Sequence, residues 1–121
     1  MIQAKYDLED RTLNFSKRIA RLARFLSKDI INRTFADQVL RSGCSVGANY
    51  IEANEALGKK DFVLRLRISR KEAKETIYWL KLIIDNNRYL DGRINPLLQE
   101  ATELLKIFSS IIEKSKDDKK E

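Results

Sequence analysis

The sequence predicts an all-α protein, an up-down bundle of four antiparallel helices. Apolar residues recur at intervals of three and four positions along four long segments, which is the helical period. The 121 residues include only four glycines and one proline, too little turn-forming material for an all-β domain with many tight hairpins. Segments of about 20 residues form helices about 30 Å long, and four such helices with short connections fit an up-down bundle.

The first helix is predicted over about residues 8–30 and the second over about residues 34–57. Thr34 is a plausible N-cap of the second helix, and Gly58 a plausible stop signal. The apolar stripe of the first helix is spaced by four, three and four positions: Phe15, Ile19, Leu22 and Leu26. The stripe of the second has the same character: Phe35, Val39, Gly43, Val46, Tyr50 and Ala53.

Small residues are concentrated in the middle of the second predicted helix. Gly43 and Gly47 lie there, and glycine inside a helix costs about 1 kcal/mol relative to alanine. The pair therefore predicts that another helix approaches closely, from the same chain or from another copy. Cys44 lies between them and is predicted to be a small core residue, since a single cysteine forms no internal disulfide.

The third helix is predicted over about residues 60–86 and the fourth over about residues 95–114, where Asn95 and Pro96 form a cap and first-turn pair. Seven residues make the stripe of the third: Phe62, Leu66, Ser69, Ala73, Ile77, Leu80 and Ile84. Five make that of the fourth: Leu97, Ala101, Leu104, Phe108 and Ile111. Together the helices predict one domain over residues 1–115, followed by a charged, disordered tail at 116–121.

A second line beside the core stripe makes the later part of the third helix apolar nearly all round. It consists of Ile68, Glu75, Trp79 and Leu82, with Tyr78 next to it. A single bundle seam needs only about three positions in seven. The extra face is covered either by the 87–93 connection folding back or by another subunit. We favour a subunit interface, where tryptophan and tyrosine are enriched.

Composition excludes several classes of activity. The chain has no histidine, which removes Ser-His-Asp and Cys-His catalysis and the histidine-containing metal sites. Glu52 and Glu75 are expected to be partly buried, each paired with an arginine or in a polar contact between helices. We therefore predict no enzyme activity, cofactor or metal. With no apolar run of about 20 residues and no signal-peptide pattern, the sequence predicts a soluble, cytoplasmic protein without membrane contact.

Basic residues exceed acidic residues by 24 to 18, and they are unevenly distributed. The first helix carries a basic stripe on the side opposite its apolar stripe, and a second basic group begins the third helix. Such rows either contact the phosphates of a nucleic acid or are simply solvated. We predict phosphate contact by these residues: Lys17, Arg18, Arg21, Arg24, Lys28, Lys59, Lys60, Arg67, Lys71 and Lys74.

The centre of the chain resembles a known family. The motifs are RSGCSVGANYIEA at 41–53, KKDFVLRL at 59–66 and KEAKETIYWL at 71–80. They are similar to those of bacterial four-helix-bundle proteins related to the proteins encoded by intervening sequences of 23S ribosomal RNA genes. The chain differs modestly: it has Ala53 where many relatives have glycine, and Gly47 where many have proline.

The resemblance implies a left-handed bundle that assembles as a ring-like homo-oligomer, typically a pentamer. It also implies similarity to the accessory proteins of diversity-generating retroelements, basic pentamers that bind nucleic acid and assist a reverse transcriptase. Residues assigned to helix packing and assembly are Arg41, Asn49, Glu52, Glu75, Tyr78, Trp79 and Leu82.

Two functions follow from the sequence. The first is a non-catalytic, homo-oligomeric bundle that binds nucleic acid, with RNA favoured over DNA, through its basic helix faces. The second is a protein-interaction scaffold, or an accessory subunit of a nucleic-acid enzyme such as a reverse transcriptase. Its partner would be an acidic or polymerase-like protein.

Overall fold

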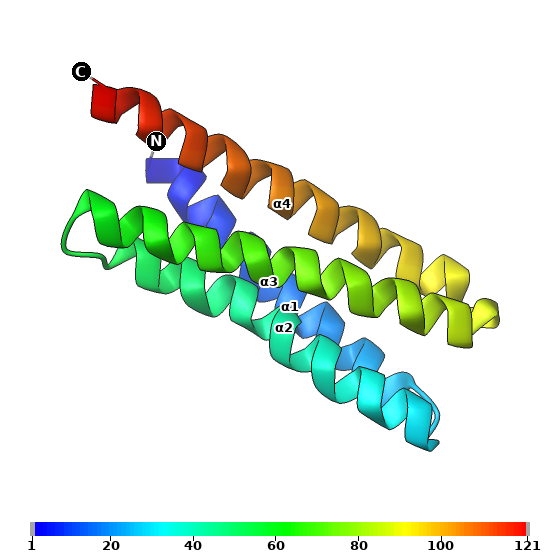
Figure 1. Cartoon of the computed structure of the whole chain (residues 1–121). Helices are drawn as coiled ribbons and strands as arrows, with labels where there is room; N and C mark the ends of the chain where they lie inside the picture. Colours follow the sequence, from blue (N-terminus) through cyan, green and yellow to red (C-terminus); the bar gives the residue numbers. More distant parts are fainter. Residues whose placement is uncertain (1, 121) are drawn as a thin grey trace.

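The chain folds into four long α-helices and contains no strand over residues 2–120, the part that the computed structural model describes. Side chains are described over residues 7–116. The elements are α1 (Ile2–Phe25), α2 (Ile30–Asn54), α3 (Lys59–Asn86), a 3₁₀ turn η1 (Arg88–Leu90) and α4 (Asp91–Lys120). Consecutive helices run in opposite directions (Figure 1). The predicted all-helical, four-helix bundle is therefore confirmed.

Each helix packs mainly against its neighbours in sequence. α2 packs extensively against α1 and α3, and α3 against α4, whereas α1 and α4 touch at only a few places. α1 and α3 lie diagonally across the bundle, with α1 behind α3 in Figure 1. Side chains that project outward from α1 and from α3 therefore lie on different sides of the molecule.

Most of the core is built from the apolar stripes that the sequence predicts. On α3 the prediction is partly wrong, because Phe62, Ile77 and Ile84 are only half-buried. Thr76 and Ile83 are buried there instead. All four stripe residues of α1 are buried, as are five of the six on α2, with only Phe35 half-buried. On α4 the predicted stripe is buried as far as Phe108, after which Ile112 enters the core and Ile111 is half-buried. Alternating steps of three and four average 3.5 residues, slightly less than the 3.6 residues of a helical turn. Over several turns the buried position therefore moves on by one residue.

α2 begins four residues earlier than predicted. Its N-cap is Asp29, whose carboxylate accepts a hydrogen bond from the backbone N–H of Asn32 at 2.8 Å. The predicted cap, Thr34, lies inside the helix and donates its hydroxyl hydrogen bond to the carbonyl of Ile30. Aspartate and threonine are both good caps, and here the aspartate is the one that follows the three-residue connection from α1.

α4 also begins earlier, at Asp91, so Pro96 lies within the helix rather than in its first turn. The 3₁₀ turn η1 leads directly into α4, and Leu90 and Ile94 are buried there. Burial of these two apolar residues extends the helix backwards past the proline. α4 continues to Lys120, and the side chains of the tail predicted as disordered at 116–121 lie almost wholly outside the described residues.

The glycines of α2 mark a close contact with α1, which confirms one of the two readings of their spacing. A Cβ atom on Gly43 would lie 3.0 Å from two side-chain carbons of Ile19, and one on Gly47 would lie 3.1 Å from the side chain of Thr12. The prediction that Cys44 fills the core is wrong, because its side chain is exposed. One helical step of about 100° carries it away from the contact that its glycine neighbours make.

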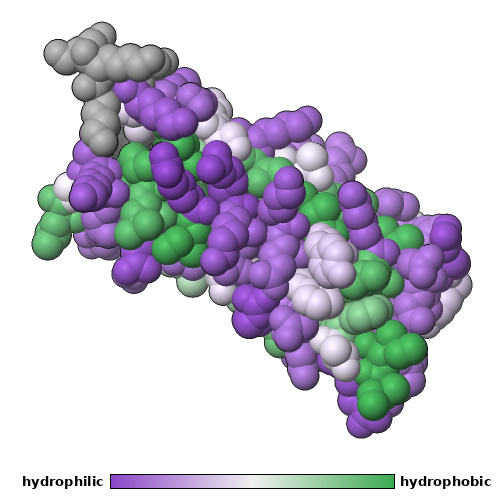
Figure 2. Space-filling model, viewed as in Figure 1, coloured by the Kyte–Doolittle hydropathy of each residue, from purple (hydrophilic) through white to green (hydrophobic). Residues whose placement is uncertain are grey.

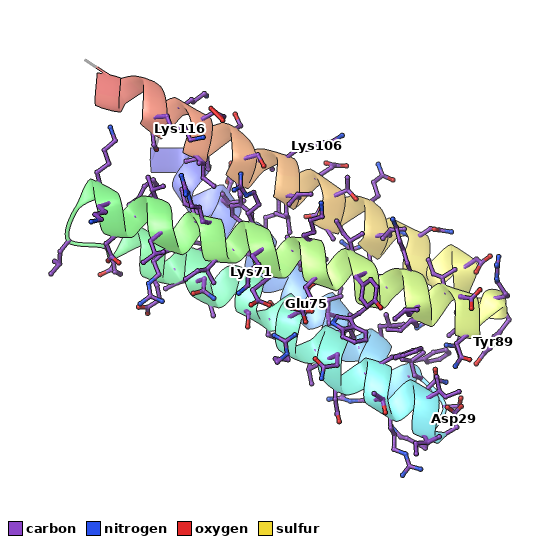
Figure 3. All side chains as sticks on the ribbon, in the orientation of Figure 1. Asp29, Lys71, Glu75, Tyr89, Lys106 and Lys116 are labelled. Carbon is purple, nitrogen blue, oxygen red and sulfur yellow. The ribbon has the colours of Figure 1, made fainter. Side chains whose placement is uncertain are left out.

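A buried amide pair joins the first turn of α2 to the α3–α4 connection. Asn32 and Asn87, 1% and 3% exposed, exchange two hydrogen bonds of 3.1 and 2.9 Å. Asn87 also donates to the carbonyl of Ile83, and Asn86 donates to the side-chain oxygen of Asn32. This amide pair holds together the end of the bundle where Asp29 and Tyr89 lie (Figure 3).

Candidate nucleic-acid interface

The first predicted basic surface follows the outer side of α1. Lys17, Arg21 and Arg24 are exposed, Arg18 is half-buried, and Lys28 is exposed in the connection to α2. Lys17, Arg21 and Arg24 lie opposite the buried stripe of the same helix, whereas Arg18 lies at its edge. Among the side chains described, none of these five residues forms an ion pair. The α1 stripe, which we define as these five residues, therefore presents unneutralised positive charge to solvent.

The second predicted basic group lies on α3, and the structure does not bring it together with the α1 stripe. Lys59, Lys60, Arg67, Lys71 and Lys74 are all exposed. Because α1 and α3 are diagonal in the bundle, the two groups form separate surfaces. The prediction that the α3 residues assist those of α1 therefore cannot mean one continuous contact within a single chain.

The α3 group lines a groove against α4. One hollow of about 300 Å³ is lined by Arg67, Arg70, Lys71 and Lys74 of α3 with Leu105 and Ser109 of α4. A neighbouring hollow of about 330 Å³ is lined by Lys59, Lys60, Val63, Leu64, Arg67, Ser115 and Lys116. Arg67 lines both, so the two hollows are adjacent, and together we call them the α3/α4 groove. Sequence reasoning left Arg70 out of the binding set, although this half-buried residue lines the groove.

Two acidic residues of α3, Glu72 and Glu75, lie on its other side, toward α2. Arg41 of α2 forms ion pairs with Glu72, at 3.3 Å, and with Glu75. The indole N–H of Trp79 donates a hydrogen bond of 3.0 Å to the same Glu75 carboxylate. Figure 3 shows Glu75 on the α2 side of α3. The four basic residues of α3 that line the first hollow and these two carboxylates therefore lie on different sides of the helix.

Burial of the carboxylates differs from the prediction. Glu75 is half-buried as expected, but Glu52 is exposed on the outer side of α2, and the buried carboxylate is Glu72, which is 9% exposed. Asn49 links the two helices more weakly, since its side-chain oxygen accepts a hydrogen bond from Arg65 at 3.4 Å. The pairing of Glu72 with Arg41 was missed because it depends on a contact between residues 31 positions apart.

An apolar surface covers the end of the bundle where α2 begins and α3 ends (Figure 2). The Trp79 ring lies 6.1 Å from that of Phe35 and 5.2 Å from that of Tyr78. Tyr78 is 58% exposed, so the 87–93 connection does not cover this face. We call this surface the aromatic patch and define it by five residues: Ile31, Phe35, Tyr78, Trp79 and Leu82.

Another hollow, of about 810 Å³, lies at the opposite end of the bundle, between α1, the α2–α3 connection and α4. Two of its polar side chains, Arg11 and Asn54, form hydrogen bonds with carboxylates that lie outside its lining. Arg11 donates hydrogen bonds of 2.7 and 2.8 Å to Glu100, which raise the pKa of the guanidinium above its ordinary value. Asn54 donates to Glu9 at 2.6 Å, and burial raises the pKa of the Tyr50 phenol.

Over the part of the chain that the structure describes, no group of three or more histidine, cysteine, aspartate or glutamate residues is placed to hold a metal ion. Within that same part, no helix is long and apolar enough to cross a membrane. The features that distinguish the surface are therefore its two basic faces and its aromatic patch.

Fold and surface together define a small four-helix bundle with segregated basic faces. The chain belongs to the 23S rRNA-intervening sequence protein family, whose model matches residues 5–110. It is also similar to a protein of unknown function from the S23 ribosomal protein family of Bacteroides thetaiotaomicron, known from its crystal structure. The two are 38% identical, with a TM-score of 0.80 over 86% of this chain and 96% of that one. No curated protein matches the chain.

Proposed function

We propose that this chain is a non-catalytic, homo-oligomeric bundle that binds nucleic acid, RNA in preference to DNA, in the cytoplasm. The observation that carries the proposal is the α1 stripe, where five basic side chains are free of ion pairs among the described residues. Membership of a family described by its link to 23S rRNA genes supports it. That description refers to where the genes lie and not to what the proteins bind. The physical argument for nucleic-acid binding is therefore the charge distribution.

Spacing within the α1 stripe suits a phosphate backbone. Lys17, Arg21 and Arg24 are separated by four and three residues, or about 6 and 4.5 Å along the helix axis. Like charges at these spacings destabilise a helix by a few tenths of a kcal/mol per pair. A bound polyanion removes that repulsion and gains the entropy of counterion release.

Charge reversal tests this contact. Arg21→Glu/Arg24→Glu should weaken RNA binding at least about 10-fold at low salt, since each change replaces an attraction to phosphate by a repulsion. The matched control is Lys106→Glu/Lys114→Glu, which changes the net charge equally. Both residues are exposed on α4, and neither belongs to the α1 stripe or lines the α3/α4 groove; Figure 3 labels Lys106. Equal loss in the two variants would show that only net charge matters. No loss in either would leave the α1 stripe to an acidic protein partner.

The aromatic patch supports the homo-oligomeric part of the proposal. Its members come from two helices and form one surface, on which Ile31 is 48% exposed and Tyr78 58% exposed. Aromatic residues are enriched in the buried centre of subunit interfaces. The resemblance noted from the sequence implies a left-handed bundle in a ring of five, and we propose that this patch is the contact between neighbouring copies.

Light scattering on size-separated protein tests the assembly. Trp79→Glu should give smaller species, but it also removes a hydrogen bond to Glu75 and could unfold the chain. Tyr78→Glu is the matched variant, because this side chain is exposed and has no hydrogen bond among the described residues. Folded protein of unchanged mass from both variants would overturn the interface assignment.

A further inference from the structure

The α3/α4 groove gathers four basic side chains around one hollow. Arg67, Arg70, Lys71 and Lys74 occupy one face of two successive turns and line one hollow. None of the four has an ion pair or hydrogen bond among the side chains described at 7–116. The acidic residues of this helix segment point to α2, where Arg41 neutralises them. Nothing described on α4 supplies a carboxylate to this hollow.

The dimensions of the groove select the form of polyanion. From Lys60 to Lys74 the helix rises about 21 Å, the length of a few extended nucleotides. Across the groove, packed helices have axes only about 8–10 Å apart. A duplex is a rigid, convex rod whose phosphates border its own minor and major grooves, about 6 and 12 Å wide. It can therefore touch only the rim of the α3/α4 groove. A single strand can lie along the floor.

The lining also indicates how the strand is held. Arginine and lysine supply the donors for phosphate oxygens, and the remaining residues are aliphatic or hydroxylic: Val63, Leu64, Leu105, Ser109 and Ser115. No aromatic side chain lines either hollow among the described residues. Base stacking, which proteins use to hold unpaired bases, is therefore not supplied by the groove. Binding should depend on the backbone and vary little with base identity.

We infer that the α3/α4 groove is a binding site for single-stranded nucleic acid, contacted through its phosphates by Arg67, Arg70, Lys71 and Lys74. This inference rests on the proposed nucleic-acid function and assigns the single strand to a face different from the α1 stripe. The groove lies on the α4 side of α3 and the aromatic patch on its α2 side, so the two are separate surfaces of one chain. One chain can then hold a single strand and a second phosphate backbone at once.

Fluorescence anisotropy with labelled 20-nucleotide oligo-U, oligo-A and a duplex RNA of equal length tests the assignment. Four phosphate contacts give a slope of log affinity against log salt near −3, since each contact with a single strand contributes about 0.7. Affinity for oligo-U should therefore fall about 50-fold between about 50 and 200 mM salt. Oligo-U and oligo-A should bind within about threefold of each other, because no stacking residue lines the site.

The decisive variant is Arg67→Gln/Arg70→Gln/Lys71→Gln/Lys74→Gln, which removes charge without adding bulk. It should lose at least about 10-fold in affinity for oligo-U and most of the salt slope, with duplex binding less affected. The matched control, Lys17→Gln/Arg21→Gln/Arg24→Gln, should show the reverse pattern. Circular dichroism melts establish that both variants are folded.

The outcomes separate this inference from the proposed function. Wild-type protein that binds duplex and single strand alike, and loses neither in the groove variant, overturns the groove assignment while the general function stands. The groove assignment is also overturned if the wild-type protein prefers duplex and the groove variant binds each RNA as the wild type does. Absence of any binding by the wild type at about 50 mM salt overturns the proposed function, and the groove inference with it.

Discussion

Replacing Asn32 with alanine should be strongly destabilising, because this side chain is the centre of the polar contact between the start of α2 and the α3–α4 connection. Asn32 donates to the side-chain oxygen of Asn87 at 3.1 Å and accepts from its amide at 2.9 Å. Both residues are almost wholly buried, at 1% and 3% exposure. Asn32→Ala leaves the oxygen of Asn87 without a partner, whereas the Asn87 amide keeps its bond to Ile83.

The magnitude follows from counting these groups. One buried acceptor without a partner costs about 1–3 kcal/mol, and the remaining lost hydrogen bonds contribute about 1 kcal/mol together. We expect the free energy of unfolding to fall by about 3 kcal/mol. At about 4 °C per kcal/mol for a domain of this size, the melting temperature should fall by about 12 °C.

Urea unfolding followed by circular dichroism at one fixed protein concentration measures the effect, since an oligomer is stabilised by its own concentration. The matched control is Asn86→Ala, because Asn86 is exposed and gives Asn32 a single bond of 3.1 Å. It should cost under about 1 kcal/mol. Asn32→Ala/Asn87→Ala should lose less than the sum of its parts. Additive single effects, or a loss below about 1 kcal/mol for Asn32→Ala, would refute the reasoning.

Three further predictions concern packing, the α1–α4 seam and alkaline pH. Gly43→Ala should destabilise the protein by about 1 kcal/mol, because overpacking of the new Cβ atom against Ile19 at 3.0 Å outweighs the gain in helix propensity. The control is Gly92→Ala, whose Cβ atom would have no neighbour within 4 Å. It should stabilise the protein by up to about 1 kcal/mol in the same urea assay. Arg11→Met should lower the free energy of unfolding by about 1 kcal/mol in dilute buffer and by much less in about 1 M salt. The reason is that the ion pairs of Arg11 are partly exposed, so salt screens them. A loss that does not depend on salt would point to packing instead. Burial raises the pKa of Tyr50, so the neutral phenol is favoured in the folded state. The free energy of unfolding should stay constant below about pH 10 and fall as the pH rises through the raised pKa. Tyr50→Phe should lessen that fall.

The helices and their buried faces could be predicted from the sequence because helical periodicity is a local property. Phe15 and Ile19 repeat at the spacing of a helix face whatever lies opposite, and both are wholly buried. Gly43 predicts a close helix contact for the same reason, since its cost within one helix calls for a partner. Helix ends were less accessible: Asp29 and Thr34 are both acceptable caps, and only tertiary packing chooses between them.

Contacts between helices could not be predicted because they depend on which faces meet. Asn32 and Asn87 are 55 positions apart, and neither shows a local pattern that marks it as buried. Arg70 was left out of the candidate site because the position of α4 makes it part of a groove. The sequence shows two basic groups but not how they are placed relative to each other, and the diagonal arrangement of α1 and α3 puts them on separate surfaces.

Binding of the purified wild-type protein to a short RNA across about 50 to 300 mM salt tests the central claim most directly. We predict binding at the low end and a linear fall of log affinity with log salt, with a slope corresponding to several phosphate contacts. The absence of binding at about 50 mM salt, or an affinity that does not change with salt, would contradict the claim that the basic faces bind nucleic acid.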